Sequence, residues 1–174
     1  MSRVRDAARP AATPRDTVRT QAGGVDHQGL THLLGYMLTL ADIPARHAFA
    51  RHVGQPLVLR PVEFSILVLV AFNPGATQTQ IAQALSIAAP NLTTLLDRLA
   101  QRGLLERVRS ASDRRAQTIH LTPRGRRLAE RAHAVSLTME QDLLAPLSSA
   151  ERRTLLELLG RVAGSRADAD QAGL

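Results

Sequence analysis

The chain has 174 residues, of which 44% are apolar but only 2% aromatic, and its net charge of +7 comes entirely from arginine, since lysine is absent. This length suits one domain with appendages, and a core of Leu, Ala, Val and Ile favours helices packed on helices. The absence of cysteine excludes disulfides, thiolate metal sites and thiol chemistry. No apolar run is long enough to span a bilayer, so we expect a cytoplasmic protein. The net positive charge indicates a polyanionic partner.

The two ends of the chain differ from its middle. Residues 1–25 are rich in Ala, Arg, Pro and Thr and lack apolar periodicity, which predicts a disordered basic arm. Residues 164–174 have a similar composition and predict a disordered tail. We expect a single domain over residues 26–163.

The first helices are indicated by apolar periodicity. A helix is predicted within about 29–54, where Pro44 kinks or splits it and Pro56 ends the segment. Pro61 begins the next helix, because a missing N–H costs nothing in a first turn. This helix is apolar on all sides through Phe72 and is therefore expected to be central and buried.

Two short helices joined by a turn come next. Thr77 and Gln80 have the spacing of a capping box for the first, and Ser86 lies in the turn. The second is predicted over about 89–102 and ends at Gly103. Its apolar residues share one face that we expect to be buried, namely Leu92, Leu95, Leu96 and Leu99.

A change of period then predicts a hairpin. Residues 104–109 and 117–121 have the pattern of two short strands around a polar loop, 110–116. Two helices, a tight turn and a basic hairpin are the order of a winged helix-turn-helix, which we place at about 57–122.

Long helices flank this winged region. Thr122 and Pro123 begin one that is predicted to reach about Leu144, and Ser148 with Glu151 forms a second capping box for the last. Because the Leu- and Ala-rich stripes of both flanking regions, about 29–54 and 123–163, need partners for burial, we expect a homodimer; a larger monomeric core is the alternative. The fold class is thus mainly α, with long flanking dimerisation helices and a two-stranded wing hairpin.

The second short helix has a polar face suited to DNA. Asn91, Thr93 and Thr94 are small hydrogen-bonding residues near its N-terminus, and Arg98 suits a phosphate or a guanine. A solvated polar surface is the alternative. The predicted DNA-binding residues of the two short helices are Thr77, Ala89, Pro90, Asn91, Thr93, Thr94 and Arg98.

Basic charge is concentrated around the hairpin. Residues 98–131 contain ten arginines against three acidic residues, an excess equal to that of the whole chain. In the loop, Arg114 and Arg115 suit a narrow minor groove, and Asp113 can hold a guanidinium in one geometry. A surface salt bridge is the alternative for these residues.

Two segments carry a family resemblance. The run NLTTLLDRLAQRGLLERV (91–108) and the run SDRRAQTIHLTPRG (112–125) resemble the recognition helix and wing of the MarR family. The resemblance extends from about Leu30 to Val162. It implies a dimer formed by the first and last helices, with Arg115 in the minor groove supported by Asp113.

Three positions depart from the family pattern. Arg60 stands where a threonine N-cap is common, and Ala88 stands where a serine often precedes the recognition helix. Each change weakens a cap by about 1 kcal/mol. Pro44 interrupts the first helix and can reshape a ligand cleft there.

The first helix also carries a set of polar residues. His32, Tyr36, Ile43 and His47 approximate one helical stripe, and the resemblance implies a groove nearby for a small aromatic carboxylate or phenol. The candidate ligand-binding residues are His32, Tyr36, Arg46, His47 and Arg51. A polar interface or surface is the alternative.

The sequence therefore predicts a sequence-specific, nucleoid-associated repressor that binds a palindromic operator as a homodimer and is released by a small aromatic effector. A ligand-independent architectural DNA-binding protein is the main alternative. An RNA-binding winged domain is disfavoured by the scarcity of aromatic residues. We expect no cofactor, no metal and no enzymatic activity, because nothing resembles a phosphate loop or a catalytic triad. His120 and His133 are expected to be a strand residue and a helix surface residue rather than metal ligands, and the sequence has no HExxH motif.

Overall fold

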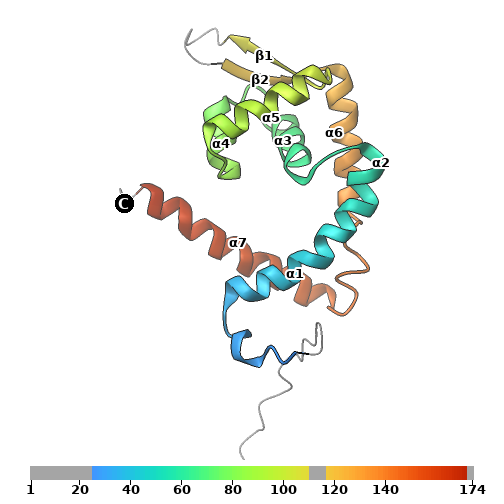
Figure 1. The fold of residues 1–174 in the computed structure, drawn as a ribbon, viewed down its shortest axis with the longest axis vertical. Coiled ribbons are helices and arrows are strands. Elements are labelled where there is room, and N and C mark those ends of the chain that lie inside the picture. Colours follow the sequence, from blue (N-terminus) through green and yellow to red (C-terminus); the bar gives the residue numbers. More distant parts are fainter. Residues whose placement is uncertain (1–24, 110–116, 172–174) are drawn as a thin grey trace, which may run out of the picture. The chain divides into compact units, whose positions relative to one another are not determined.

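The protein is mainly helical, with a two-stranded antiparallel hairpin, as the sequence predicts. The computed structural model describes residues 25–109 and 117–171 (Figure 1). A 3-10 turn, Gln28–Leu30, precedes the other elements. These are α1 (Leu34–Phe49), a π-helix (Ala50–Gly54), α2 (Gln55–Leu57), α3 (Pro61–Phe72), α4 (Gln78–Leu85), α5 (Ala89–Gln101), β1 (Leu105–Arg109), β2 (Gln117–Leu121), α6 (Pro123–Ser136) and α7 (Ser149–Gln171).

The chain divides by its contacts into two compact units, with the boundary between Ile43 and Pro44. In the first unit, the Tyr36 hydroxyl is hydrogen-bonded to Nδ1 of His27, and the two rings lie 5.8 Å apart in a tilted arrangement. The predicted arm lies outside the described residues apart from Val25, and the single domain expected over 26–163 stays a prediction.

The first helical stretch ends beside Pro56, as the sequence predicts. Pro44 lies inside α1 and does not split it, and helical structure continues through the π-helix into α2, which ends at Leu57, one residue after Pro56. The reversal comes at Val58, which has a left-handed φ of 52°.

The core of the second unit is mainly aliphatic and centres on α3. Ile66 and Leu67 are fully buried, as expected for a helix that is apolar on all sides, although Phe72 at its end is 66% exposed. Three of the four leucines predicted for the buried face of the second short helix, Leu92, Leu96 and Leu99, are also fully buried, while Leu95 is half-buried. Figure 1 shows α3 beside α6, with α4 and α5 on its other side.

The hairpin pairs β1 with β2 in the register Leu105 to Leu121. A third segment, which the sequence did not indicate, joins it. Thr77 forms an isolated antiparallel bridge with Thr118, and the Ile119 N–H donates to the Ala76 carbonyl at 2.9 Å. The start of α4 is therefore attached to the wing.

The end of α5 is a Schellman motif built on Gly103, as the sequence predicts. Gly103 has a φ of +67°, its N–H donates to the Ala100 carbonyl at 2.8 Å, and the Leu104 N–H donates to the Leu99 carbonyl at 3.0 Å. Leu99 and Leu104 are both buried, which adds the apolar contact typical of this motif.

The start of α6 lies directly against this turn. The Thr122 hydroxyl donates to the Gly103 carbonyl at 2.7 Å and accepts from the Gly125 N–H at 3.0 Å. The Thr122 N–H donates to the Leu104 carbonyl at 3.2 Å. A Cβ on Gly125 would lie 1.7 Å from that same carbonyl oxygen, so only glycine permits this approach.

The last two helices differ in length from the prediction. α6 ends at Ser136 rather than near Leu144. The hydroxyls of Ser136 and Thr138 donate to the carbonyls of His133 and Val135, which competes with regular helical bonding. α7 continues to Gln171, so the disordered tail predicted from residue 164 is wrong over 164–171; the alanines of this segment favour a helix.

The predicted capping box of the last helix is present. The Ser148 hydroxyl and its backbone N–H donate to the Glu151 carboxylate at 2.7 and 2.8 Å, and they hold the pKa of that carboxyl below its usual value. This stabilisation is present above the usual carboxyl pKa and is lost as the pH falls through the lowered pKa.

No single helix among the described residues has both the length and the apolar character to cross a bilayer. The bent pair Leu34–Leu57 and Pro61–Phe72 meets these criteria only when the two helices are taken together.

We predict that Gly125→Ala destabilises the fold by about 1 to 3 kcal/mol, because its new Cβ must displace the Leu104 carbonyl. Urea unfolding at a fixed protein concentration measures this change. Gly160→Ala in α7 is the matched control, because no atom lies within 4 Å of the position that its new methyl group would occupy. Helix propensity alone predicts that alanine stabilises both sites by about 0.5 to 1 kcal/mol, so a stabilised Gly125→Ala would contradict the close approach.

Candidate nucleic-acid interface

Helices α4 and α5 form the helix-turn-helix. Ser86 lies in the turn with a left-handed φ of 54°, and its N–H donates to the carbonyls that end α4. Ala88 is the N-cap of α5 and makes no side-chain capping bond, as its sequence predicts. The apolar face of α5 is fixed by the core, so its polar face is held outward.

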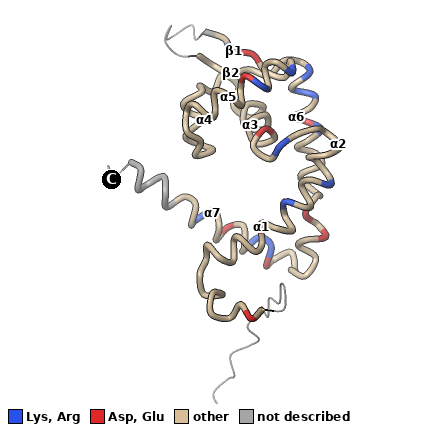
Figure 2. The backbone as a smooth tube through the Cα atoms, in the orientation of Figure 1, with Lys and Arg blue, Asp and Glu red and all other residues tan. Residues whose placement is uncertain are grey.

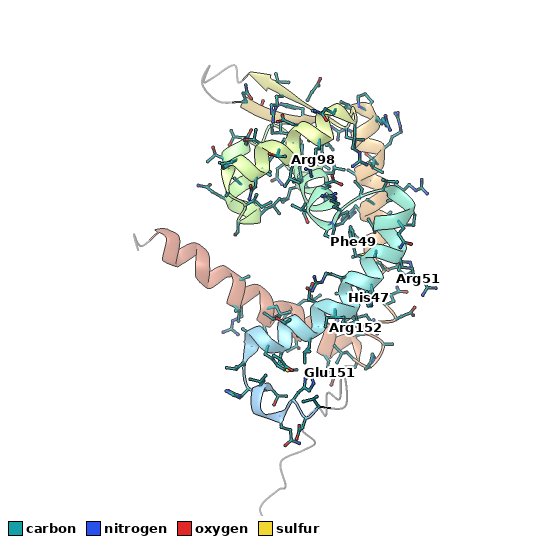
Figure 3. The ribbon with its side chains drawn as sticks, in the orientation of Figure 1. His47, Phe49, Arg51, Arg98, Glu151 and Arg152 are labelled. Carbon is teal, nitrogen blue, oxygen red and sulfur yellow. The ribbon has the colours of Figure 1, made fainter. Side chains whose placement is uncertain are left out.

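The residues predicted to bind DNA lie on that outward face. Ala89, Pro90 and Asn91 are exposed in the first turn of α5, and Thr93 and Thr94 are exposed in the next. Arg98 follows on the same helix (Figure 3). The structure thus brings these side chains to one surface, and their contacts with DNA remain a prediction.

Thr93 is tied to α4 by a hydrogen bond that the sequence did not indicate. Gln78 donates through Nε2 to the Thr93 hydroxyl at 2.6 Å, and that hydroxyl donates to the Ala89 carbonyl at 3.0 Å. The Thr94 hydroxyl likewise bonds to the Pro90 carbonyl at 3.2 Å. Because a hydroxyl has one proton, neither threonine has a free donor for a base edge, whereas their methyl groups are uncommitted.

Thr77, also predicted to contact DNA, has a capping role in the structure. Its hydroxyl accepts from the Gln80 N–H at 3.2 Å, and its own N–H donates to Oε1 of Gln80 at 2.8 Å. This reciprocal pair is the predicted capping box of α4. Thr77 is half-buried and also bridges to the wing.

An ion pair joins α5 to the hairpin. Arg107 of β1 donates to Oδ1 of Asp97 at 2.6 Å and makes a longer bond of 3.4 Å to the Thr93 carbonyl. Helical periodicity places Asp97 on the polar face of α5 but gives no sign of this partner. The pair fixes the wing strand against the middle of the recognition helix.

The predicted wing residues Asp113, Arg114 and Arg115 lie outside the described residues. The strands on either side of them are described, and the register places Arg109 opposite Gln117.

The predicted ligand-binding residues are divided between the two units. His32 is exposed and Tyr36 is half-buried in the first unit, where the tyrosine hydroxyl is already paired with His27. In the second unit, His47 and Arg51 are exposed and follow one another along the helical stretch that carries Phe49 (Figure 3). Arg46 is also exposed.

The winged region contains a cavity that the sequence did not indicate. It has a volume of about 480 Å³, within the range of small-molecule sites, and lies between the end of α3 and α4. Its lining comprises Leu69, Asn73, Pro74, Gly75, Ala76, Gln80, Ile81 and Ala84.

His120 and His133, which are not expected from the sequence to bind a metal, contact other side chains in the structure. Nε2 of His120 in β2 lies 3.0 Å from the Thr118 hydroxyl, and the His133 ring in α6 lies 5.1 Å from the ring of Phe72. Within residues 25–109 and 117–171, no group of three or more His, Asp or Glu residues is placed to hold a metal ion.

An outward polar helix on a rigid aliphatic core, a tight turn to the helix before it, and an attached hairpin define a winged helix-turn-helix DNA-binding protein. A family model described as the MarR family matches residues 59–116. A protein assigned to regulation of the hcr operon in Thauera aromatica is 32% identical over 136 residues, which cover 78% of this chain and 82% of that protein.

Solved structures agree with this relationship. The transcriptional repressor CouR bound to a 23-mer DNA duplex has a TM-score of 0.73 and 38% identity, covering 80% of this chain and 98% of CouR. CouR bound to p-coumaroyl-CoA has a TM-score of 0.70 and 36% identity, with coverage of 80% and 97%. The chain belongs to the MarR family of winged helix-turn-helix transcriptional regulators.

The Thr93 hydroxyl is already hydrogen-bonded to Gln78 and to the Ala89 carbonyl. We therefore predict that any contact of Thr93 with a base is made by its methyl group. We expect Thr93→Val, which keeps the methyl group, to retain operator discrimination. We expect Thr93→Ser, which keeps the hydroxyl, to lose about 0.8 kcal/mol, the value of one methylene-sized apolar contact.

Fluorescence anisotropy on an operator selected from random duplexes, with each thymine replaced in turn by uracil, measures this contact. Wild type and Thr93→Val should lose affinity at one thymine, and Thr93→Ser should be insensitive there. A loss in Thr93→Val equal to that in Thr93→Ala would instead assign recognition to the hydroxyl.

Proposed function

We propose that this regulator is a sequence-specific repressor that binds a palindromic operator as a homodimer and is released by a small aromatic effector. The observation that carries the proposal is the exposed face of α5, where Asn91, Thr93 and Thr94 stand on three fully buried leucines. A rigid helix with small polar and methyl groups near its N-terminus suits base edges in a major groove. The protein would act in the cytoplasm at the nucleoid.

The DNA-bound structure of CouR supports this use of the fold, because CouR is a transcriptional repressor with 38% identity to this chain. The wing residues Asp113, Arg114 and Arg115 would add minor-groove contacts at the hairpin tip. Thr77 would support α4 through its cap, near phosphates at the edge of the groove.

The homodimer is supported by apolar side chains at both ends of the described chain. In α7, Leu155, Leu156 and Leu158 are 40%, 62% and 49% exposed. In the first unit, Leu34 and Leu38 are 49% and 44% exposed. Helices with exposed leucine stripes gain stability when a second copy covers them, and a two-fold dimer would match two half-sites one helical turn apart.

A ligand-independent architectural DNA-binding protein is the alternative function. It would bind operator and random duplexes with similar affinity, and no small molecule would release it.

Two substitutions distinguish base recognition from backbone contact. We predict that Asn91→Ala weakens operator binding by about 1 to 3 kcal/mol and leaves random-sequence binding unchanged. Arg115→Ala should instead reduce the slope of log K against log salt by about one, and Asp113→Ala should do so in part. Anisotropy titrations across a salt series provide both quantities. Equal losses on both duplexes in Asn91→Ala, or unchanged salt slopes in both wing variants, would disprove the respective roles.

The effector class is supported by a second CouR structure. CouR binds p-coumaroyl-CoA, whose acyl group contains a phenolic ring. We propose that a small planar aromatic acid, or the thioester of such an acid, binds beside α1 on His32, Tyr36, Arg46, His47 and Arg51. A guanidinium or imidazole would pair with the carboxylate while apolar side chains hold the ring.

We predict that such an acid raises the operator dissociation constant and that His47→Ala abolishes this response. A hundredfold rise requires the ligand to disfavour the DNA-competent state by about 2.7 kcal/mol. Because His47 is exposed and distant in sequence from α5, the variant should bind DNA normally without ligand.

Titration of hydroxylated benzoates, nicotinate and their thioesters into the protein–operator complex tests this. If His47→Ala responds as wild type does, the effector binds elsewhere, and the cavity between α3 and α4 is the next site to test by substitution of Ala84.

A further inference from the structure

Two neighbouring cavities at the C-terminal end of α5 are lined by arginine. One, of about 340 Å³, is lined by Arg60, Glu63, Arg98, Gln101 and Arg102. The other, of about 370 Å³, has four arginines among its lining residues, namely Arg102, Arg124, Arg127 and Arg131. Arg102 belongs to both, so the arginines form one continuous basic surface from α5 to α6. In Figure 2, basic positions gather where the end of α5 lies beside α6.

Among the described residues, the only carboxylate lining these two cavities is buried and already neutralised. Glu63 is 5% exposed, and its Oε2 accepts from the Arg60 N–H at 2.9 Å and from Arg102 at 3.2 Å. The second terminal nitrogen of Arg102 donates to the Val58 carbonyl at 2.7 Å. Glu63 and the Val58 carbonyl therefore hold the Arg102 side chain in one position, between the two cavities.

The three arginines of α6 have a different environment. Arg124, Arg127 and Arg131 are all exposed, and their spacing of three and four residues places them on one helical face. Within the part of the chain that the structure describes, none of them makes an ion pair with a carboxylate. Three uncompensated charges on one face repel one another, and a polyanion would relieve this repulsion.

The direction of α5 indicates which polyanion suits this surface. In a helix-turn-helix the N-terminal residues of the recognition helix contact base edges, and the 13 residues of α5 extend about 20 Å at 1.5 Å per residue. If the first two turns contact bases, Arg98 and the C-cap residue Arg102 lie away from those bases, where phosphate contacts fix a protein's position on the duplex. The arginine face of α6 adjoins that end.

We propose that Arg124, Arg127 and Arg131 bind the sugar-phosphate backbone of the operator, so that the DNA interface continues past α5 onto α6. This inference rests on the proposed function. These contacts would contribute affinity and salt dependence without sequence preference.

The test compares two double variants with the same loss of charge. Arg127→Gln/Arg131→Gln removes two arginines from the basic surface. Arg126→Gln/Arg153→Gln removes one from α6 and one from α7, neither of which lines the two cavities. All four side chains are exposed, so thermal unfolding should confirm that both variants remain folded.

We expect the cavity variant to reduce the slope of log K against log salt by about two, at about 0.9 per phosphate contact, and to weaken operator and random duplexes by the same factor. The control variant should retain the wild-type slope. Equal slopes in the two variants would overturn the proposal while wild-type operator binding still stands, and failure of the wild type to bind any operator would reject the proposed function itself.

A phosphorylated small molecule is the other occupant to consider. Isothermal titration calorimetry with free coenzyme A measures whether such a molecule binds to the protein, and with what affinity. If coenzyme A binds the wild type and not the cavity variant, while the variant retains wild-type affinity and salt slope on DNA, the surface belongs to a small ligand and the backbone assignment is wrong.

Discussion

The approach of Gly125 to the Leu104 carbonyl is the constraint on which the DNA-binding unit depends. At this point the end of α5, the base of the hairpin and the start of α6 are in direct contact with one another. Thr122 completes the junction, since its hydroxyl and N–H bond to the two residues that end α5. Because Leu105 and Leu121 pair immediately beside it, the end of the recognition helix and the base of the hairpin strands are attached to one another at this junction.

Contacts farther along α5 extend this rigidity to the DNA-binding face. Arg107 holds β1 against Asp97, and Gln78 holds α4 against Thr93. Both pairs are partly exposed, so each contributes little to the free energy of unfolding. Their value lies in fixing side chains before DNA arrives, because ordering them at the moment of binding would cost affinity.

The features predicted correctly from sequence are those set by neighbouring residues. The capping boxes at Thr77 and Ser148 and the glycine turn at Gly103 depend on spacings of a few residues, and each is present. The features that were missed join distant positions: Glu63 with Arg102, Gln78 with Thr93, and Thr77 with Thr118. No local pattern specifies such pairs, because they depend on how the helices pack. The early end of α6 lies between these two classes. Ser136 and Thr138 are neighbours in the sequence, but the sequence does not indicate that their hydroxyls bond to backbone carbonyls.

Val58 shows that this fold has not been optimised for stability alone. A β-branched residue in the left-handed region is strained by about 1 to 2 kcal/mol, and at 74% exposure its side chain recovers little of that cost through burial. Its carbonyl is held by Arg102, a bond that any residue at this position could accept. Glycine or asparagine would adopt the same turn with less strain. Replacing Val58 by glycine or asparagine is therefore a way to raise thermostability at a position outside the core and away from the predicted base-contacting residues of α5.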